Sequence, residues 1–222
     1  MLHCSASLLT VSLALPLATP VAAQGKSAPA ARSAEAGGTR RILVLGDSLS
    51  AEYGLTRGSG WVALMTERLQ GQRQPADVIN ASISGDTTSG GLSRLPALLQ
   101  QHKPTHLVIE LGGNDALRGL PSAMTQENLR AMVKAGKAAG AKVLLVGMQI
   151  PPNMGARYAR DFEAGFKTVA QQEQVALVPF LLAGVADRPD AADWFQPDRI
   201  HPLAKAHPVM LENVWKVLRP ML

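Results

Sequence analysis

The sequence predicts an α/β fold with a five-stranded parallel sheet covered by helices on both faces. Short apolar runs rich in β-branched residues alternate along the chain with longer segments of helical periodicity, without an internal repeat. The 222 residues are 46% apolar, which is enough to bury one substantial core and favours a single folded domain. Successive strand–helix–strand units of this kind form right-handed crossovers.

The individual elements follow from this alternation. The expected strands are residues 42–45, 78–81, 106–111, 143–147 and 176–178. The expected helices are residues 61–70, 88–101, 126–139, 158–172 and 204–218. We expect Thr125 to cap the third helix and Gly140 to end it, and Pro202 lies just ahead of the last helix, where its missing N–H is harmless.

The amino-terminal segment predicts export. Residues 1–23 contain no Asp, Glu, Lys or Arg, and residues 8–18 form an apolar stretch of the length of a signal-peptide core, followed by Val21-Ala22-Ala23. Pro16 and Pro20 interrupt this segment before it reaches the length of a membrane span. We therefore expect a signal peptide over 1–23, a disordered Ala/Ser/Gly/Pro leader over 24–39, a folded domain over 40–222, and an exported protein without a stable membrane anchor.

Charge and cysteine content exclude several classes of function. The formal net charge is +5, but the Lys and Arg residues are dispersed and form no basic run, so no nucleic-acid partner is expected. Cys4 is the only cysteine and lies in the predicted signal peptide. The mature chain then has no thiol nucleophile, disulfide or thiolate metal site.

Small motifs follow the first three predicted strands. Ser48 lies in Gly46-Asp-Ser-Leu, Gly85 in Ser82-Ile-Ser-Gly-Asp86, and Asn114 in Gly112-Gly-Asn-Asp115. Ligands of an open parallel sheet bind outside the carboxyl ends of the strands, so these residues should converge at one edge. Asp198 and His201 follow the fifth strand and can reach the same edge.

The residue types indicate acyl transfer. A serine hydroxyl needs a base to take its proton, and histidine is the side chain whose ordinary pKa lies near neutrality. We therefore interpret Ser48 as nucleophile, His201 as base and Asp198 as the group that orients the imidazole. The Ser48 N–H, the Gly85 N–H and the Asn114 amide are candidate oxyanion donors.

Other interpretations remain open at this point. Each motif alone is typical of a strand-ending turn. A metal-dependent hydrolase could use carboxylate and imidazole ligands, namely Asp47, Asp86, Asp115, Asp198 and His201. A non-catalytic binding module on the same fold is the third alternative, since fold does not determine function.

The four blocks containing Ser48, Gly85, Asn114 and His201, in that order, resemble the SGNH (GDSL) hydrolases over residues 40–222. The longer strings Gly46-Asp-Ser-Leu-Ser-Ala51, 78–87, Glu110-Leu-Gly-Gly-Asn-Asp115 and Gly147-Met-Gln-Ile-Pro151 are similar to the bacterial multifunctional acyl-CoA thioesterase I / lysophospholipase and arylesterase branch. The resemblance implies a flavodoxin-like three-layer α/β/α sandwich and a serine esterase that needs neither cofactor nor metal. Together with the amino-terminal leader, it implies a periplasmic, or possibly secreted, location. It also implies a catalytic triad of Ser48, Asp198 and His201, and an oxyanion hole of Ser48, Gly85 and Asn114.

Further expectations concern the substrate. The implied substrates are aryl esters, acyl-CoA thioesters and lysophospholipids, handled by a monomer. The apolar loops after the third and fourth strands suggest that Leu117 and Ile150 contact the acyl chain. Glu52, in the turn after the nucleophile block, is expected to place a carboxylate near the mouth of the site.

Overall fold

The computed structural model describes Met1 and residues 40–72 and 76–222. The predicted signal peptide and leader lie outside the described residues. The folded part contains one five-stranded parallel sheet with the order β2-β1-β3-β4-β5. Its strands are β1 (Arg40–Gly46), β2 (Ala76–Asn80), β3 (His106–Glu110), β4 (Lys142–Val146) and β5 (Ala176–Val178). The predicted α/β fold class is confirmed.

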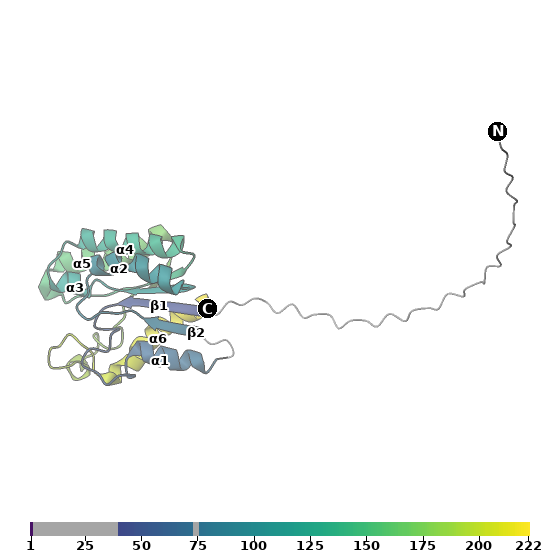
Figure 1. Ribbon diagram of the computed structural model, residues 1–222. Coiled ribbons are helices and arrows are strands. Elements are labelled where there is room, and N and C mark those ends of the chain that lie inside the picture. Colours follow the sequence, from purple (N-terminus) through teal and green to yellow (C-terminus); the bar gives the residue numbers. More distant parts are fainter. Residues whose placement is uncertain (2–39, 73–75) are drawn as a thin grey trace. The chain divides into compact units, whose positions relative to one another are not determined.

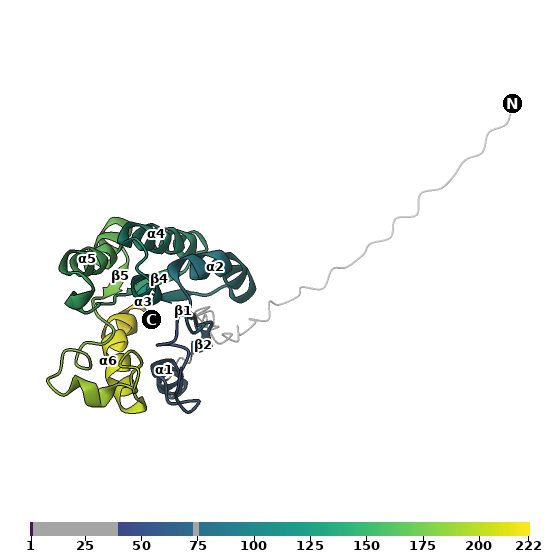
Figure 2. The ribbon, with the colours of Figure 1, turned by 90° about the vertical axis from the view of Figure 1, so that its left-hand side faces the viewer.

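Helices cover both faces of the sheet. Figures 1 and 2 show α1 (Trp61–Gln70) and α6 (His207–Leu218) on one face. The opposite face carries α2 (Thr88–His102), α3 (Gly113–Leu117), α4 (Ser122–Ala138) and α5 (Ala156–Glu173). Short 3₁₀ turns occur at Pro152–Met154, Ala191–Trp194, Ala204–Ala206 and Arg219–Met221. The three-layer arrangement is the one that the resemblance implies.

The core lies against the two central strands. The residues of β1 from Ile42 to Leu45 and the whole of β3 are buried, as expected for parallel strands covered on both faces. The register pairs Gly46 with Glu110. Because β1 and β3 end side by side, the residues that follow them emerge at the same edge of the sheet.

The third predicted helix begins earlier than expected. α4 starts at Ser122, directly after Pro121, so Thr125 lies inside the helix and does not cap it. The Thr125 hydroxyl instead donates to the buried carboxylate of Asp115 at 3.3 Å. Proline supplies a suitable φ for a helix start, which explains the earlier boundary. Gly140 follows this helix with a φ of +81°, as expected for a helix-ending glycine.

The last predicted helix is divided. Residues Ala204–Ala206 form a 3₁₀ turn, and α6 begins at His207 with Pro208 in its first turn. A continuous α-helix from residue 204 would need an N–H at position 208, which proline lacks. Pro202 lies before this 3₁₀ turn and forms an isolated bridge with Phe195.

Among the described residues, no helix has the length and apolar character that crossing a bilayer requires.

Candidate active site

Ser48 lies in a tight turn directly after β1. The Asp47 carbonyl accepts the N–H groups of Ser50 and Ala51, at 3.2 and 2.9 Å, and so bends the chain sharply away from the sheet. A Cβ at Gly46 would lie 2.8 Å from the side chains of Ser50 and Ser82, so the turn has room only for glycine there. This geometry leaves the Ser48 side chain half-buried at the edge of the sheet.

His201 lies between Ser48 and Asp198. Its Nε2 is 2.9 Å from Ser48 Oγ, and its Nδ1 is 2.6 Å from Asp198 Oδ2. The other oxygen of Asp198 accepts the N–H groups of Ile200 and His201, at 2.9 and 3.0 Å. The structure thus brings together the three residues of the predicted triad, although they come from opposite ends of the folded part.

The surroundings of Asp198 keep it ionised. Partial burial acts to raise its pKa, but the hydrogen bonds from the His201 side chain and from the two backbone N–H groups outweigh this effect and lower the pKa to about 2. A charged Asp198 fixes the Nδ1–H tautomer of His201, which leaves the Nε2 lone pair for the Ser48 hydroxyl. The ring of Tyr53 packs against the imidazole with centroids 4.3 Å apart.

Two backbone N–H groups near Ser48 are available for an oxyanion. Within residues 40–72 and 76–222, neither the Ser48 N–H nor the Gly85 N–H donates to another protein group. Gly85 has a φ of +79°, a conformation that glycine adopts without strain. Its loop is held from both sides: Arg118 Nη2 donates to the Gly85 carbonyl at 2.8 Å, and Arg94 Nε pairs with Asp86 at 2.8 Å.

Asn114 lies in the first turn of α3, which follows β3. The chain enters α3 through Gly112 at a φ of +122°, where a Cβ would approach Phe166 to 3.1 Å. Asp115, fully buried in the next position, accepts the backbone N–H of Thr88 at 2.8 Å and the hydroxyls of Thr88 and Thr125. This carboxylate connects α3 to α2 and α4 and thereby fixes the position of Asn114.

A cavity of about 710 Å³ opens beside these residues. Ser48, Asn114 and His201 line one end of it, and the predicted acyl-contacting residues Leu117 and Ile150 also line it. Gly85 is not among the lining residues. The remaining wall is largely apolar and includes Met148, Pro151, Met154, Phe180, Leu182, Ala186, Ala191, Ala192 and Phe195.

Sequence reasoning missed part of this wall. The segment from Phe180 to Phe195, which follows β5, contributes apolar side chains to the cavity. The apolar run Phe180-Leu-Leu182 at the carboxyl end of a strand was the available signal, since ligands bind at those ends. Tyr53 and its contact with His201 were also missed.

The expectation for Glu52 was wrong. Its carboxylate does not line the cavity but accepts the backbone N–H groups of Gly58 and Gly60, at 3.0 and 2.7 Å. The residue has a φ of +61°, which turns its side chain back over the loop that leads to α1. At the mouth of the cavity the structure instead places an exposed cation, Arg199.

The residues of the metal-site alternative do not gather. Asp86 pairs with Arg94, Asp115 is enclosed by the threonines of α2 and α4, and Asp47 faces Asn114. In the described part of the chain, no cluster of three or more His, Cys, Asp or Glu side chains is placed to hold an ion.

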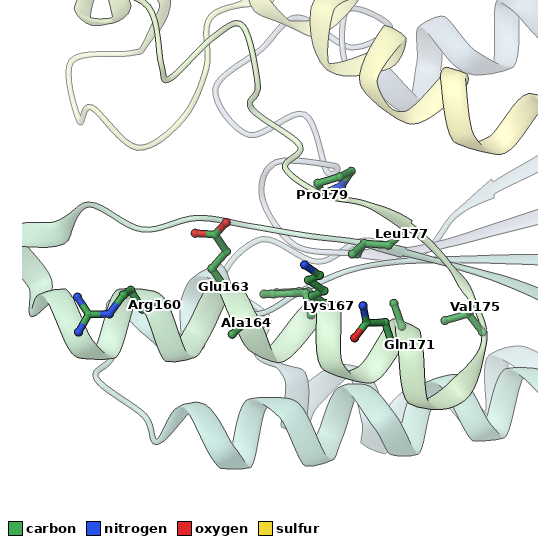
Figure 3. A pocket seen from close by; sticks show the side chains of 10 residues that line it. Arg160, Glu163, Ala164, Lys167, Gln171, Val175, Leu177 and Pro179 are labelled. Atoms are coloured by element: carbon green, nitrogen blue, oxygen red, sulfur yellow. The ribbon is translucent and has the colours of Figure 1, made fainter.

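A second cavity, of about 670 Å³, lies along α5 and β5. Figure 3 shows Arg160, Glu163, Lys167 and Gln171 along one side of α5, beside Leu177 and Pro179. None of the predicted site residues lines this cavity. The chemistry predicted from the sequence therefore belongs to the cavity beside Ser48.

Comparison with known proteins identifies the family. Residues 44–209 match the model of the GDSL-like lipase/acylhydrolase family. The chain belongs to this family. The match spans the segment from β1 into α6 and so includes every residue of the candidate site.

Individual relatives of this GDSL-like hydrolase are enzymes. The chain is 52% identical over 181 residues to esterase TesA of Pseudomonas aeruginosa, covering 82% of this chain and 89% of that protein. It is 42% identical over 180 residues to thioesterase 1/protease 1/lysophospholipase L1 of Escherichia coli K12, covering 81% and 84%. The crystal structure of the esterase EstA from Pseudoalteromonas sp., inhibited by monoethylphosphonate, superimposes with a TM-score of 0.76 at 41% identity, covering 82% and 98%.

The family membership and the prediction of an ester-hydrolysing enzyme are confirmed. A purely non-catalytic binding module is accordingly set aside. The chemical roles of individual residues in this GDSL-like hydrolase rest on the geometry described above.

Proposed function

We propose that this GDSL-like hydrolase cleaves acyl esters and thioesters through an acyl intermediate on Ser48. The observation that carries the proposal is the continuous chain of contacts from Ser48 Oγ through His201 to Asp198, with distances of 2.9 and 2.6 Å. A hydroxyl beside an oriented imidazole is the arrangement that activates a serine.

The reaction then follows two steps. His201 Nε2 takes the proton of Ser48 Oγ, which attacks the carbonyl carbon, and the negative charge collects on the carbonyl oxygen. The Ser48 N–H, the Gly85 N–H and the Asn114 amide stabilise that charge. The protonated His201 gives its proton to the leaving alcohol or thiol, and the acyl group stays on Ser48. His201 then takes a proton from water, which attacks the acyl carbon, and returns that proton to Ser48 Oγ as the bond between Oγ and the acyl carbon breaks and the acid leaves.

The cavity supports an acyl substrate. Its apolar wall suits a hydrocarbon chain, and we assign Leu117 and Ile150 to contact with that chain. Arg199, an exposed cation that lines the cavity, suits a substrate whose leaving group carries phosphate. The proposed substrates are therefore aryl esters together with acyl-CoA thioesters and lysophospholipids, both of which carry phosphate.

A substrate panel tests the proposal. We expect measurable kcat/KM on aryl esters of increasing chain length, palmitoyl-CoA and a lysophospholipid, and loss of turnover in Ser48→Ala. The matched control is Ser89→Ala, an exposed serine of α2. Turnover by folded Ser48→Ala near the wild-type rate would refute the acyl-serine mechanism. Labelling of Ser48 by an organophosphonate, and activity that survives a strong chelator, separate this mechanism from a metal-dependent one.

We also propose that the protein is exported and acts in the periplasm as a monomer, without a nucleic-acid partner. The composition of residues 1–23 supports export. Mass spectrometry of the protein from a periplasmic fraction should give a mature chain that begins at or near Gln24. A full-length chain confined to the cytosol would contradict the proposal.

A further inference from the structure

Asp47, between Gly46 and the nucleophile, has a buried carboxylate that the reaction scheme above does not use. The residue is 2% exposed. Its Oδ1 accepts the Leu49 N–H at 3.0 Å, and its Oδ2 accepts the Asn114 side-chain amide at 3.0 Å. Both oxygens of the carboxylate therefore face N–H donors.

The contact with Asp47 determines how Asn114 can act. A side-chain amide nitrogen carries two hydrogens, and the torsion that turns the amide group has broad preferences. When one hydrogen is donated to Asp47, the amide plane is fixed, and the second hydrogen is left for another acceptor. Asn114 lines the cavity beside Ser48, so that acceptor can be the oxyanion of the substrate.

A second buried acid lies behind Asp47. Glu110, at the end of β3, is 2% exposed and accepts the Ser50 hydroxyl at 2.7 Å. Burial, reinforced by the neighbouring Asp47 carboxylate, raises the pKa of Glu110 well above its usual value. Burial also raises the pKa of Asp47, to about 6, whereas the hydrogen bonds from Leu49 and Asn114 and the proximity of His201 oppose the rise.

Three titratable groups lie around Asp47: Glu110 from β3, His201 from the loop before α6, and Asp86 from the loop after β2, which is paired with Arg94. Two carboxyl groups at one buried site do not both ionise readily. A protonated Asp47 would turn an O–H towards a position where a donor already points. At Glu110 the two donors, the Ser50 hydroxyl and the Asp47 N–H, both point to Oε2, so a proton on Oε1 meets no donor among the described residues. The proton of the pair therefore belongs on Glu110.

We propose that Asp47 is a positioning residue that holds the Asn114 amide in the oxyanion hole, and that Glu110, as the neutral member of the buried pair, keeps Asp47 an acceptor. This inference rests on the proposed role of Asn114 as an oxyanion donor. Asp47, the acidic residue of the Gly-Asp-Ser-Leu turn, then contributes through Asn114 to stabilising the transition state, in addition to its hydrogen bond within the turn.

A double-mutant cycle on an aryl ester tests the role of Asp47. Asp47→Ser keeps a side-chain oxygen that can accept the Leu49 N–H, but it removes the acceptor for Asn114. We expect kcat to fall about 10-fold or more with KM nearly unchanged, because the lost interaction acts on the transition state. In an Asn114→Ala background the same substitution should change kcat by less than about 3-fold, because its target is gone. Asp77→Ser, at an exposed position of β2, is the matched control.

The outcomes are distinguishable. If Asp47→Ser lowers kcat by the same factor with and without Asn114, Asp47 does not act through Asn114, and the inference is wrong while the proposed function stands. If Asn114→Ala alone leaves kcat unchanged, the oxyanion role of Asn114 fails, and the inference fails with it. Should Asp47→Ser not fold, Asp47→Thr serves in the same cycle, since its hydroxyl can also accept the Leu49 N–H and the substitution also removes the acceptor of the Asn114 amide.

The role of Glu110 has a spectroscopic test that uses the intact enzyme. At pH 7 the infrared spectrum should contain the carbonyl stretch of a neutral, buried carboxylic acid, and Glu110→Gln should lose that band. Absence of the band from the wild type, or its persistence in Glu110→Gln, would overturn the assignment of the proton to Glu110.

Discussion

Among individual residues, Asp198 is partly exposed to solvent although both of its carboxylate oxygens accept hydrogen bonds. Its side chain is 37% exposed, yet both of its oxygens accept hydrogen bonds, two from backbone N–H groups and one from His201. Because these bonds lower its pKa to about 2, the carboxylate stays charged across the physiological range. Any stability that these contacts provide is present above pH 3.8 and is lost as the pH falls through about 2.

The substitution Asp198→Asn tests whether the charged Asp198 carboxylate orients the His201 imidazole. The amide keeps the shape of the side chain but favours the wrong tautomer of His201, so kcat should fall by about 10³- to 10⁴-fold with little change in melting temperature. Asp193→Asn, at an exposed position of the Ala191–Trp194 turn, is the control. Ester hydrolysis within tenfold of the wild type would show that Asp198 does not orient the base.

Ile150 is the second residue-scale test. It is half-buried in the wall of the cavity, so Ile150→Trp should shorten the space available to the acyl chain. We expect kcat/KM for long-chain aryl esters to fall about 10-fold or more, because a few excluded methylene groups have that effect. The acetate ester serves as the internal control. A uniform change across all chain lengths, in Ile150 and Leu117 variants alike, would remove both residues from the acyl site.

At the element scale, α3 is a single short helix whose position depends on one buried carboxylate. Asp115 accepts the Thr88 N–H and two threonine hydroxyls, which connects α3 to α2 and α4. Asn114 precedes Asp115, so the stability of this junction and the geometry of the proposed oxyanion hole are linked. Because α3 has only five residues, its position depends largely on this contact with its neighbours.

Asp115→Ala should therefore destabilise the whole fold. The substitution leaves the Thr88 N–H and the Thr125 hydroxyl without their buried acceptor, whereas the Thr88 hydroxyl still accepts from the Asn128 amide. We expect a cost of about 2–4 kcal/mol of unfolding free energy. Urea unfolding followed by circular dichroism measures this. Asp161→Ala, exposed on α5 in an ion pair that contributes little, is the control. Equal stabilities of the two variants would contradict the proposed junction.

At the scale of the whole molecule, one buried histidine connects distant parts of the chain. His207, at the start of α6, is 2% exposed, and its Nδ1 accepts the backbone N–H of Trp61 at the start of α1. Burial lowers the pKa of His207 from 6.5 to about 4, although a hydrogen bond with Pro202 opposes this shift. The contact joins the two helices that cover one face of the sheet.

The sign of the resulting pH dependence follows from linkage. His207 is neutral in the folded protein, whereas the unfolded chain takes up a proton below pH 6.5, so this residue lowers stability as the pH falls from about 6.5 to about 4. The limiting slope is about 1.4 kcal/mol per pH unit.

The substitution His207→Asn isolates the contribution of His207 to the pH dependence of stability. The Asn side-chain oxygen can accept the Trp61 N–H but does not titrate, so stability of the variant relative to the wild type should increase as the pH falls from 6.5 to 4. Unfolding free energies from urea titrations at several pH values measure this difference. His102→Asn, at the end of α2, is the control. Parallel pH curves for His207→Asn and the wild type would contradict the prediction.

Much of this architecture was predictable because its causes are local. Apolar runs and helical periodicity predicted all five strands, and α1 agrees with its predicted bounds. α3 was missed because five residues between glycines carry too little periodicity to indicate a helix. The helix start assigned to Thr125 was wrong because its hydroxyl has a tertiary partner, Asp115, that no local pattern indicates.

From the sequence alone, the type of fold, the family resemblance and the proposed nucleophile, base and acid could be predicted. These depend on residue types and on the rule that strand ends of a parallel sheet share one edge. Only the tertiary structure decided where buried carboxylates point: Asp47 towards Asn114, Asp115 towards Thr88, and Glu52 away from the cavity. It also supplied the wall from Phe180 to Phe195. Such contacts join residues far apart in the chain. Burying a charged group is costly unless it is hydrogen-bonded, and the spacing of residues along the sequence does not show which donors will lie beside it.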